Sequence, residues 1–289
     1  MGRKSLELTR WVMVLGNPLR LSWAALNKFK ADSGFFLSSG ITFSLLMGLI
    51  PLSLLLLALA GAYLYSDQVV LSHLSKHLED MLPSVDPNMM NSILTIIQDR
   101  KIVGFLGIVG VVWTATCVFS SLRTALNIVF QVEAGQGILK GKAVDLFMVF
   151  LAGVFHIVTM GFTSVVTYIH GYHFSLFLEL GPIIRFFLKY LLPFFFTFWM
   201  FFLIYKIIPN RKIHFWAAFR ATFFTSLFWE GAKQFFGWYV LRLGGYSLVY
   251  GSLGTLVIFV LWVYYSSAIL LLGGEIAFLL EKERGRINA

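Results

Sequence analysis

The chain has 289 residues, of which 58% are hydrophobic and 13% charged, and its mean hydropathy is +0.80. Soluble domains are about 45–50% apolar and about 25% charged, so this composition excludes a soluble protein and predicts an integral membrane protein. The net charge of +9 is therefore interpreted against a membrane. A single cysteine, Cys117, excludes an intrachain disulfide and a cysteine-rich metal site.

Residues 1–34 are predicted to form a cytoplasmic amphipathic segment. Apolar residues between Leu6 and Phe29 recur at helical spacing beside arginine and lysine, with a break before Pro18. This pattern is typical of short helices that lie in the inner headgroup region, anchored by tryptophan and basic groups. A cap packed under the membrane helices explains the same pattern equally well.

Six stretches are long enough to cross a bilayer, since a spanning helix needs about 20 mostly apolar residues. They are 35–65, 102–122, 144–169, 186–207, 215–240 and 252–276. The predicted fold is an all-α polytopic membrane protein, with a membrane domain over 35–281 and a basic tail over 282–289. Lysine and arginine gather near the N-terminus, in the second and fourth connections and in the tail, so the positive-inside rule places both termini in the cytoplasm.

Two features of the first two spans concern helix packing. Pro51 removes a backbone donor and is expected to kink the first span, either as a substrate-binding break or as a tolerated proline in a tightly packed helix. Gly104, Gly107 and Gly110 leave a shallow groove on the second span, and close packing of a neighbouring helix is the better explanation.

Residues 66–101 are predicted to form an extracytoplasmic helical hairpin that divides at Pro83. His73 and His77 lie four residues apart on its first helix. Because no third ligand is placed beside them, we expect solvated helix residues rather than a metal site. No cofactor is predicted either.

Ionisable side chains inside the spans are the main functional signal. Each costs about 2.5–3.5 kcal/mol to insert, so we expect these groups to face protein or water. Glu230 and Lys233 lie one turn apart and can pair. Glu275 follows two glycines on the cytoplasmic side, where Arg123 and Arg220 are also expected. The candidate residues of a substrate cavity are Arg123, Arg185, Lys189, Arg220, Glu230, Lys233 and Glu275.

Prolines and glycines mark four candidate helix breaks or hinges: Pro51, Pro193, Gly251 and Gly254. The last two belong to a stretch, 250–254, that is predicted to precede the sixth span. Exposed backbone donors at that helix start can receive an anion, although a tight turn is the simpler explanation.

Several motifs occur in order along the chain: 44–51, Gly104-Phe105, Phe119, Leu122-Arg123, 125–127, 208–211, Trp229-Glu230 with Lys233, 250–254, Trp262 and 272–275. Together they resemble the YihY/BrkB family of bacterial inner-membrane proteins, once labelled ribonuclease BN. The resemblance covers nearly the whole chain and implies a multi-pass inner-membrane fold with six spans. The family's virulence-factor name and a suspected role in lipid transport come with the resemblance.

Basic residues outnumber acidic ones within the spans, which favours a transporter or flippase-like carrier of an anionic amphiphile such as a lipid or envelope precursor. The alternative is a non-transporting scaffold or regulator of envelope assembly, in which charged residues only join helices. Ribonuclease activity, and catalysis in general, is not expected, because the six histidines are scattered and no ATPase motif occurs. The expected partners are membrane lipids and an anionic substrate, not nucleic acid.

Overall fold

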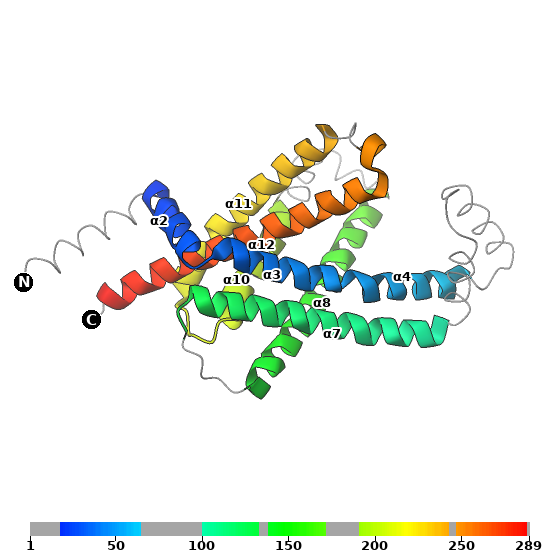
Figure 1. The fold of residues 1–289 in the computed structure, drawn as a ribbon, viewed down its shortest axis with the longest axis horizontal. Coiled ribbons are helices and arrows are strands. Elements are labelled where there is room, and N and C mark those ends of the chain that lie inside the picture. The colour runs from blue at the N-terminus through cyan, green and yellow to red at the C-terminus, as the bar shows by residue number, and fades with distance from the viewer. Residues whose placement is uncertain (1–17, 65–99, 133–137, 172–190, 243–246, 288–289) are drawn as a thin grey trace, which may run out of the picture. The chain divides into compact units, whose positions relative to one another are not determined.

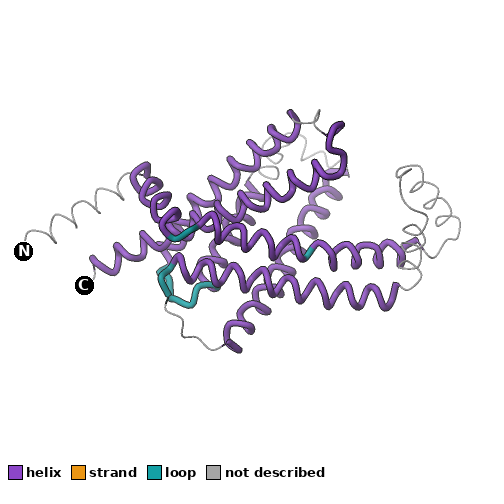
Figure 2. The backbone as a smooth tube through the Cα atoms, in the orientation of Figure 1, coloured by secondary structure: helices purple, strands orange, loops and turns teal. Residues whose placement is uncertain are grey.

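The computed structural model describes residues 18–64, 100–132, 138–171, 191–242 and 247–287. Within these ranges the regular structure is helical (Figures 1 and 2). The helices are α2 (Pro18–Ala31), α3 (Gly34–Met47), α4 (Leu49–Leu64), α7 (Arg100–Val129), α8 (Ile138–Gly171), α10 (Leu192–Ile207), α11 (Phe215–Arg242) and α12 (Ser247–Ile287). The predicted hairpin over 66–101, with His73 and His77, lies outside the described residues.

Three helical stretches in the described part of the chain are long and apolar enough to cross a membrane: Gly34–Leu59, Lys101–Val129 and Leu256–Glu283. They overlap the first, second and sixth predicted spans. Leu192–Ile207 is apolar but shorter. An all-helical architecture suited to a membrane is thereby supported, while the number of six spans and their orientation stay predictions.

The chain divides into two compact units, Phe43–Val118 and the remainder, Met1–Thr42 with Phe119–Ala289. In the first of these units, the glycine groove of α7 receives α4, as the sequence predicts. A Cβ added to Gly107 would lie 3.0 Å from the backbone of Leu55, and one added to Gly110 would lie 2.6 Å from Pro51. Without side chains at these glycines, the two backbones approach closely.

The first predicted span is interrupted near its proline. Gly48 separates α3 from α4, and Pro51 follows three residues later. Proline has no N–H to donate to the carbonyl four residues earlier, and its ring crowds that carbonyl, so the helix breaks just before it. At the break, the Gly48 N–H donates to the carbonyl of Leu45, three residues earlier, at 3.0 Å.

In the second unit, α2 packs against α12. Leu21, Ala25 and Phe29 are spaced four residues apart on α2 and are all buried. The opposite face is open, with Leu19 and Trp23 exposed by 78% and 67%. For residues 18–31 the structure therefore shows the packed cap, and a headgroup position for the open face stays a prediction.

The helices α10, α11 and α12 meet around a buried tyrosine. The Tyr205 hydroxyl lies 2.7 Å from the Leu270 carbonyl, to which it donates, and 3.1 Å from the Thr225 hydroxyl. Gly273 lies against the same two side chains, and an added Cβ would come within 1.9 Å of Thr225 Oγ1 and 2.1 Å of the Tyr205 hydroxyl. Close approach of α12 to α10 and α11 thus requires glycine at this position.

Helix α12 starts earlier than the sequence predicts, and Pro193 lies at the start of α10. Helix α12 begins at Ser247, so Gly251 and Gly254 lie inside its first turns and not in a turn before it. The prediction failed because glycine is an unfavourable helix residue whose local preference the flanking apolar residues can override. Pro193 lies in the first turn of α10, where a missing N–H leaves no hydrogen bond unmade.

We expect Gly273→Ala to lower the stability of the purified protein by about 1–3 kcal/mol, because the added methyl group overpacks a closed contact. Thermal unfolding in detergent, followed by tryptophan fluorescence, measures the effect. Gly153→Ala is the matched control, since its Cβ meets nothing within 4 Å. Equal melting temperatures for the two variants would contradict the assignment.

Candidate functional site

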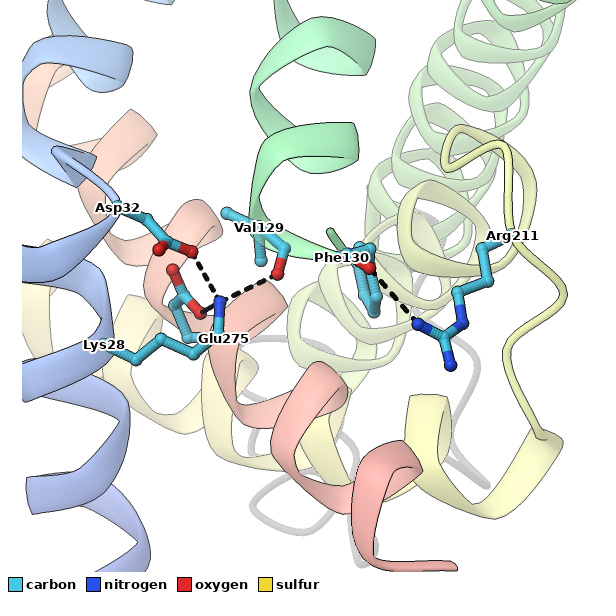
Figure 3. A network of polar contacts seen from close by, with 6 residues as sticks. All are labelled: Lys28, Asp32, Val129, Phe130, Arg211 and Glu275. Atoms are coloured by element: carbon cyan, nitrogen blue, oxygen red, sulfur yellow. Dashed lines mark hydrogen bonds and ion pairs between the residues drawn. The ribbon is translucent and has the colours of Figure 1, made fainter. Parts of the chain in front are cut away.

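The Lys28 ammonium lies at the centre of a buried polar network (Figure 3). Its Nζ atom is 2.5 Å from Asp32 Oδ2, 2.6 Å from Glu275 Oε2 and 2.8 Å from the Val129 carbonyl oxygen. These three oxygens come from the turn that follows α2, from α12 and from the end of α7. One cation therefore joins three separate segments of the chain.

Glu275 is fully buried, and the Lys28 side chain is only 13% exposed. Removing a carboxylate from water is tolerated only when a cation and hydrogen-bond donors compensate it. Lys28 supplies that charge, and its Nζ also lies 4.3 Å from the centre of the Phe278 ring, one turn further along α12. The pair thereby fixes α2 against α12.

The sequence predicts that Glu275 lies close to Arg123 and Arg220. In the structure its partner is Lys28. Arg123 instead pairs with Asp145 of α8, with 3.0 Å between Nη2 and Oδ2. Gly141 permits this pair, because a Cβ there would lie 1.5 Å from Arg123 Nη1. Asp145 is buried, whereas the Arg123 side chain is 15% exposed.

The other candidate residues fall into two groups. Glu230 and Lys233 pair at 2.6 Å, which confirms the prediction from their spacing. Arg220 is exposed and lies close enough to Glu283 for their charges to interact. Arg185 and Lys189 lie outside the described residues.

Backbone contacts extend the network to the 208–214 loop, which is drawn in teal in Figure 2. The Asn210 N–H donates to the Asn127 side-chain oxygen at 2.9 Å, and Arg211 donates to the Phe130 carbonyl at 3.3 Å. The His214 N–H donates to Glu281 at 2.8 Å. The end of α7, this loop and α12 therefore form one cluster of contacts.

An apolar hollow of about 450 Å³ lies among α7, α8 and α10. Among the described residues, Thr197 is the one hydroxyl-bearing side chain in its lining. The five candidate charged residues that the structure describes, Arg123, Arg220, Glu230, Lys233 and Glu275, do not line it. The lining residues are Phe119, Met148, Leu151, Ala152, Phe155, Phe196, Thr197, Met200, Leu203 and Ile204. A smaller hollow of about 250 Å³ lies between α3 and α7 and includes the hydroxyl-bearing residues Ser120, Ser121 and Thr124.

Sequence reasoning missed Lys28 and Asp32, because both fall in the predicted amphipathic segment over 1–34 and precede the first predicted span. A local signal was present, since the two residues have the i, i+4 spacing of a helical ion pair. The contact with Glu275, 247 residues away, left no trace in the sequence pattern.

Long apolar helices, a stripe of glycines between two of them and buried ion pairs define the class of this protein as a helical membrane protein. The family model described as virulence factor BrkB matches residues 25–289, and the chain belongs to that family.

Three similar curated proteins are each named a UPF0761 membrane protein. A UPF0761 membrane protein of Haemophilus influenzae is 24% identical over 264 residues, covering 91% of this chain and 94% of the relative. One from Glaesserella parasuis is 28% identical over 70% of this chain and 71% of its own length. One from Aggregatibacter aphrophilus is 25% identical over 89% of each chain. No solved structure matches.

We expect Lys28→Met to destabilise the protein by about 3–5 kcal/mol, because it leaves the buried Glu275 carboxylate uncompensated. Glu275→Met should cost less, because Lys28 keeps Asp32 as its partner. The double variant should lose much less than the sum of the two. A double-mutant cycle of thermal unfolding in detergent measures the difference. Additive losses would show that the two side chains do not depend on one another.

Proposed function

We propose that this protein is a carrier of an anionic amphiphile, a lipid or an envelope precursor, in the bacterial inner membrane. The observation that carries the proposal is an apolar hollow that lies one helical turn from a basic group held by a carboxylate. An amphiphile has the complementary chemistry, with an apolar chain and a charged head. Six spans with both termini in the cytoplasm are part of the proposal.

The hollow and the Arg123–Asp145 pair follow one another along two helices. Phe119 precedes Arg123 by four residues on α7, and Met148 follows Asp145 by three on α8. Residues at these spacings share one face of a helix, about 5 Å apart along its axis. The lining of the hollow therefore begins next to the ion pair and continues away from it.

The length of the hollow suits a hydrocarbon chain. On α8 its lining runs from Met148 to Phe155, which is roughly 10 Å of helix. Phe155 and Phe196 form an edge-to-face pair with ring centres 5.4 Å apart at the end that is distant from the ion pair. Aliphatic and aromatic walls with one hydroxyl group favour an apolar ligand.

The charge beside the hollow favours an anion. Lys142 and Arg123 both lie close enough to Asp145 for their charges to act on it, so two cations face one carboxylate. Arg123 Nε is buried and has no hydrogen-bond partner among the described residues. A phosphate or carboxylate headgroup would supply the missing charge and acceptor.

The scaffold alternative is supported by other residues. Lys28 with Glu275, and Glu230 with Lys233, are paired within the protein, so these charges need no ligand to be compensated. Under that alternative the hollow holds no substrate and the protein acts through partners in the envelope. We propose no catalytic activity under either alternative.

Lipid scrambling in proteoliposomes tests the carrier proposal, with fluorescent phosphatidylglycerol as the substrate and dithionite as the external quencher. The full-length protein should accelerate exchange between leaflets. Ala152→Phe, which fills the hollow, should slow exchange about tenfold if closing the site raises the barrier by about 1.4 kcal/mol. The double variant Arg123→Gln/Asp145→Asn, which removes both charges, should slow it similarly.

Val154→Phe is the control, because Val154 is 40% exposed on the same helix and does not line the hollow. Its exchange rate should equal that of the natural protein. Unaltered exchange in both Ala152→Phe and the double variant would exclude this site. No exchange above protein-free vesicles would favour the scaffold.

A further inference from the structure

One buried carboxyl oxygen at the contact between α2 and α12 lacks a hydrogen-bond donor. Lys28 Nζ has three hydrogen atoms to donate, and Asp32 Oδ2, Glu275 Oε2 and the Val129 carbonyl oxygen accept them. Glu275 Oε1 is buried and has no partner among the described residues. Because buried polar atoms in native proteins are nearly always paired, Glu275 Oε1 requires a donor other than Lys28.

The charges at this contact do not balance when both carboxyl groups are ionised. Asp32 and Glu275 then carry two negative charges against the one positive charge of Lys28. Within the described part of the chain, Lys28 and Asp32 are the charged groups that act on Glu275. Arg123 is engaged by Asp145 instead. One negative charge would therefore stay uncompensated beside a fully buried side chain, which is costly.

The two carboxyl groups also face one another. Both accept from Lys28 Nζ, at 2.5 and 2.6 Å, so one ammonium group holds them together. The free oxygen of Glu275 is turned toward Asp32 in Figure 3, and the two groups lie within hydrogen-bonding reach. Two carboxyl groups that share one site disfavour the doubly ionised state, so one of them retains a proton.

A proton on Glu275 Oε1 supplies the missing donor and the missing positive charge together. The O–H group donates to the Asp32 carboxylate in a charge-assisted hydrogen bond, and Lys28 balances the one negative charge that remains. A water molecule would supply a donor but no charge. A metal ion would need several more ligands, and the described residues contain no group of three or more His, Cys, Asp or Glu side chains that could hold one.

We propose that Asp32 and Glu275 share one proton and that release of this proton loosens α2 from α12. We call Lys28, Asp32 and Glu275 the lysine–carboxyl triad. With the proton bound, the triad is neutral. When the Oε1–H bond breaks and water takes the proton, two carboxylates face one ammonium group and repel each other across the contact. The Asp32 side chain is 19% exposed, so the proton exchanges with solvent there.

The direction of the pH effect follows from where the proton is held. The folded triad holds a proton that the same carboxyl groups release once unfolding separates them. The stability that the triad contributes is therefore present at low pH and lost as the pH rises, by up to about tenfold in the folding equilibrium per pH unit. Leu21, Ala25 and Phe29, the buried face of α2, lose their packing in the loosened state.

This inference does not depend on the carrier proposal, because no residue of the triad lines the apolar hollow. If the protein is a carrier, the triad makes the position of α2 sensitive to pH. If it is a scaffold, the triad does the same for a surface that partners meet.

Infrared difference spectroscopy of the full-length protein in detergent tests the shared proton, because a protonated carboxyl group has its own C=O stretching band. The natural protein should show such a band and lose it as the pH rises. Glu275→Gln should lack the band. Asp32→Asn should also lack it, because Glu275 is then the one carboxylate at Lys28 and ionises. Glu281→Gln is the control, since Glu281 already accepts from the His214 N–H at 2.8 Å, and it should keep the band.

Hydrogen–deuterium exchange of residues 18–31 in the same samples tests the loosening of α2. Glutamine has the shape and the hydrogen bonds of protonated glutamate, so Glu275→Gln should match the natural protein at low pH. At high pH the natural protein should exchange faster than Glu275→Gln, by up to about tenfold per pH unit. Comparison at equal pH removes the intrinsic pH dependence of amide exchange.

A carboxyl band that survives in both Glu275→Gln and Asp32→Asn would overturn the shared proton. Equal exchange of α2 in the natural protein and Glu275→Gln at every pH would overturn its release as the cause of loosening. Failure of Glu275→Gln to fold would also contradict the proposal. Tightening of α2 by sodium at constant ionic strength and high pH would assign the site to a metal ion instead.

Discussion

The compensation of one buried carboxylate is the constraint on which this arrangement of helices depends. Glu275 can be fully buried only because Lys28 lies 2.6 Å away, and Lys28 can be withdrawn from water only because Asp32 and the Val129 carbonyl also accept from it. The three acceptors come from distant parts of the chain. Helix α2 is therefore an integral part of the second unit and not an appendage, and the end of α7 is held at the same point.

Charged residues in this protein have two different roles. Lys28 and Glu275 are sealed within the protein and join helices, which is the role that the scaffold alternative gives to all the charges. Arg123 is also paired, but it borders an apolar hollow, shares its carboxylate with Lys142 and retains an unpartnered nitrogen. The two sites therefore differ in their access to a ligand and in their local charge balance. Arg123 is informative about a ligand, whereas Lys28 and Glu275 are not.

Some of the motifs that link the chain to its family contact one another. Asn127, Asn210, Arg211 and Glu275 all belong to the contacts at the end of α7, the 208–214 loop and α12. These residues hold the end of α7, the loop and α12 together. Gly273 allows α12 to approach α10 and α11. Family resemblance in this region accordingly explains how the helices are held together, and the chemistry of any ligand must be sought at Arg123 and in the hollow.

The sequence alone determined the features that depend on neighbouring residues: the apolar helices, the interruption near Pro51, the glycine groove for a neighbouring helix, and the Glu230–Lys233 pair. Helical periodicity and backbone chemistry dictate all of these locally. Only the tertiary structure decided that Glu275 binds Lys28, that Arg123 binds Asp145 and that α12 starts before Gly251. The rotation and register of each helix select among several oppositely charged partners, and they are set by packing over the whole unit, which no local pattern records.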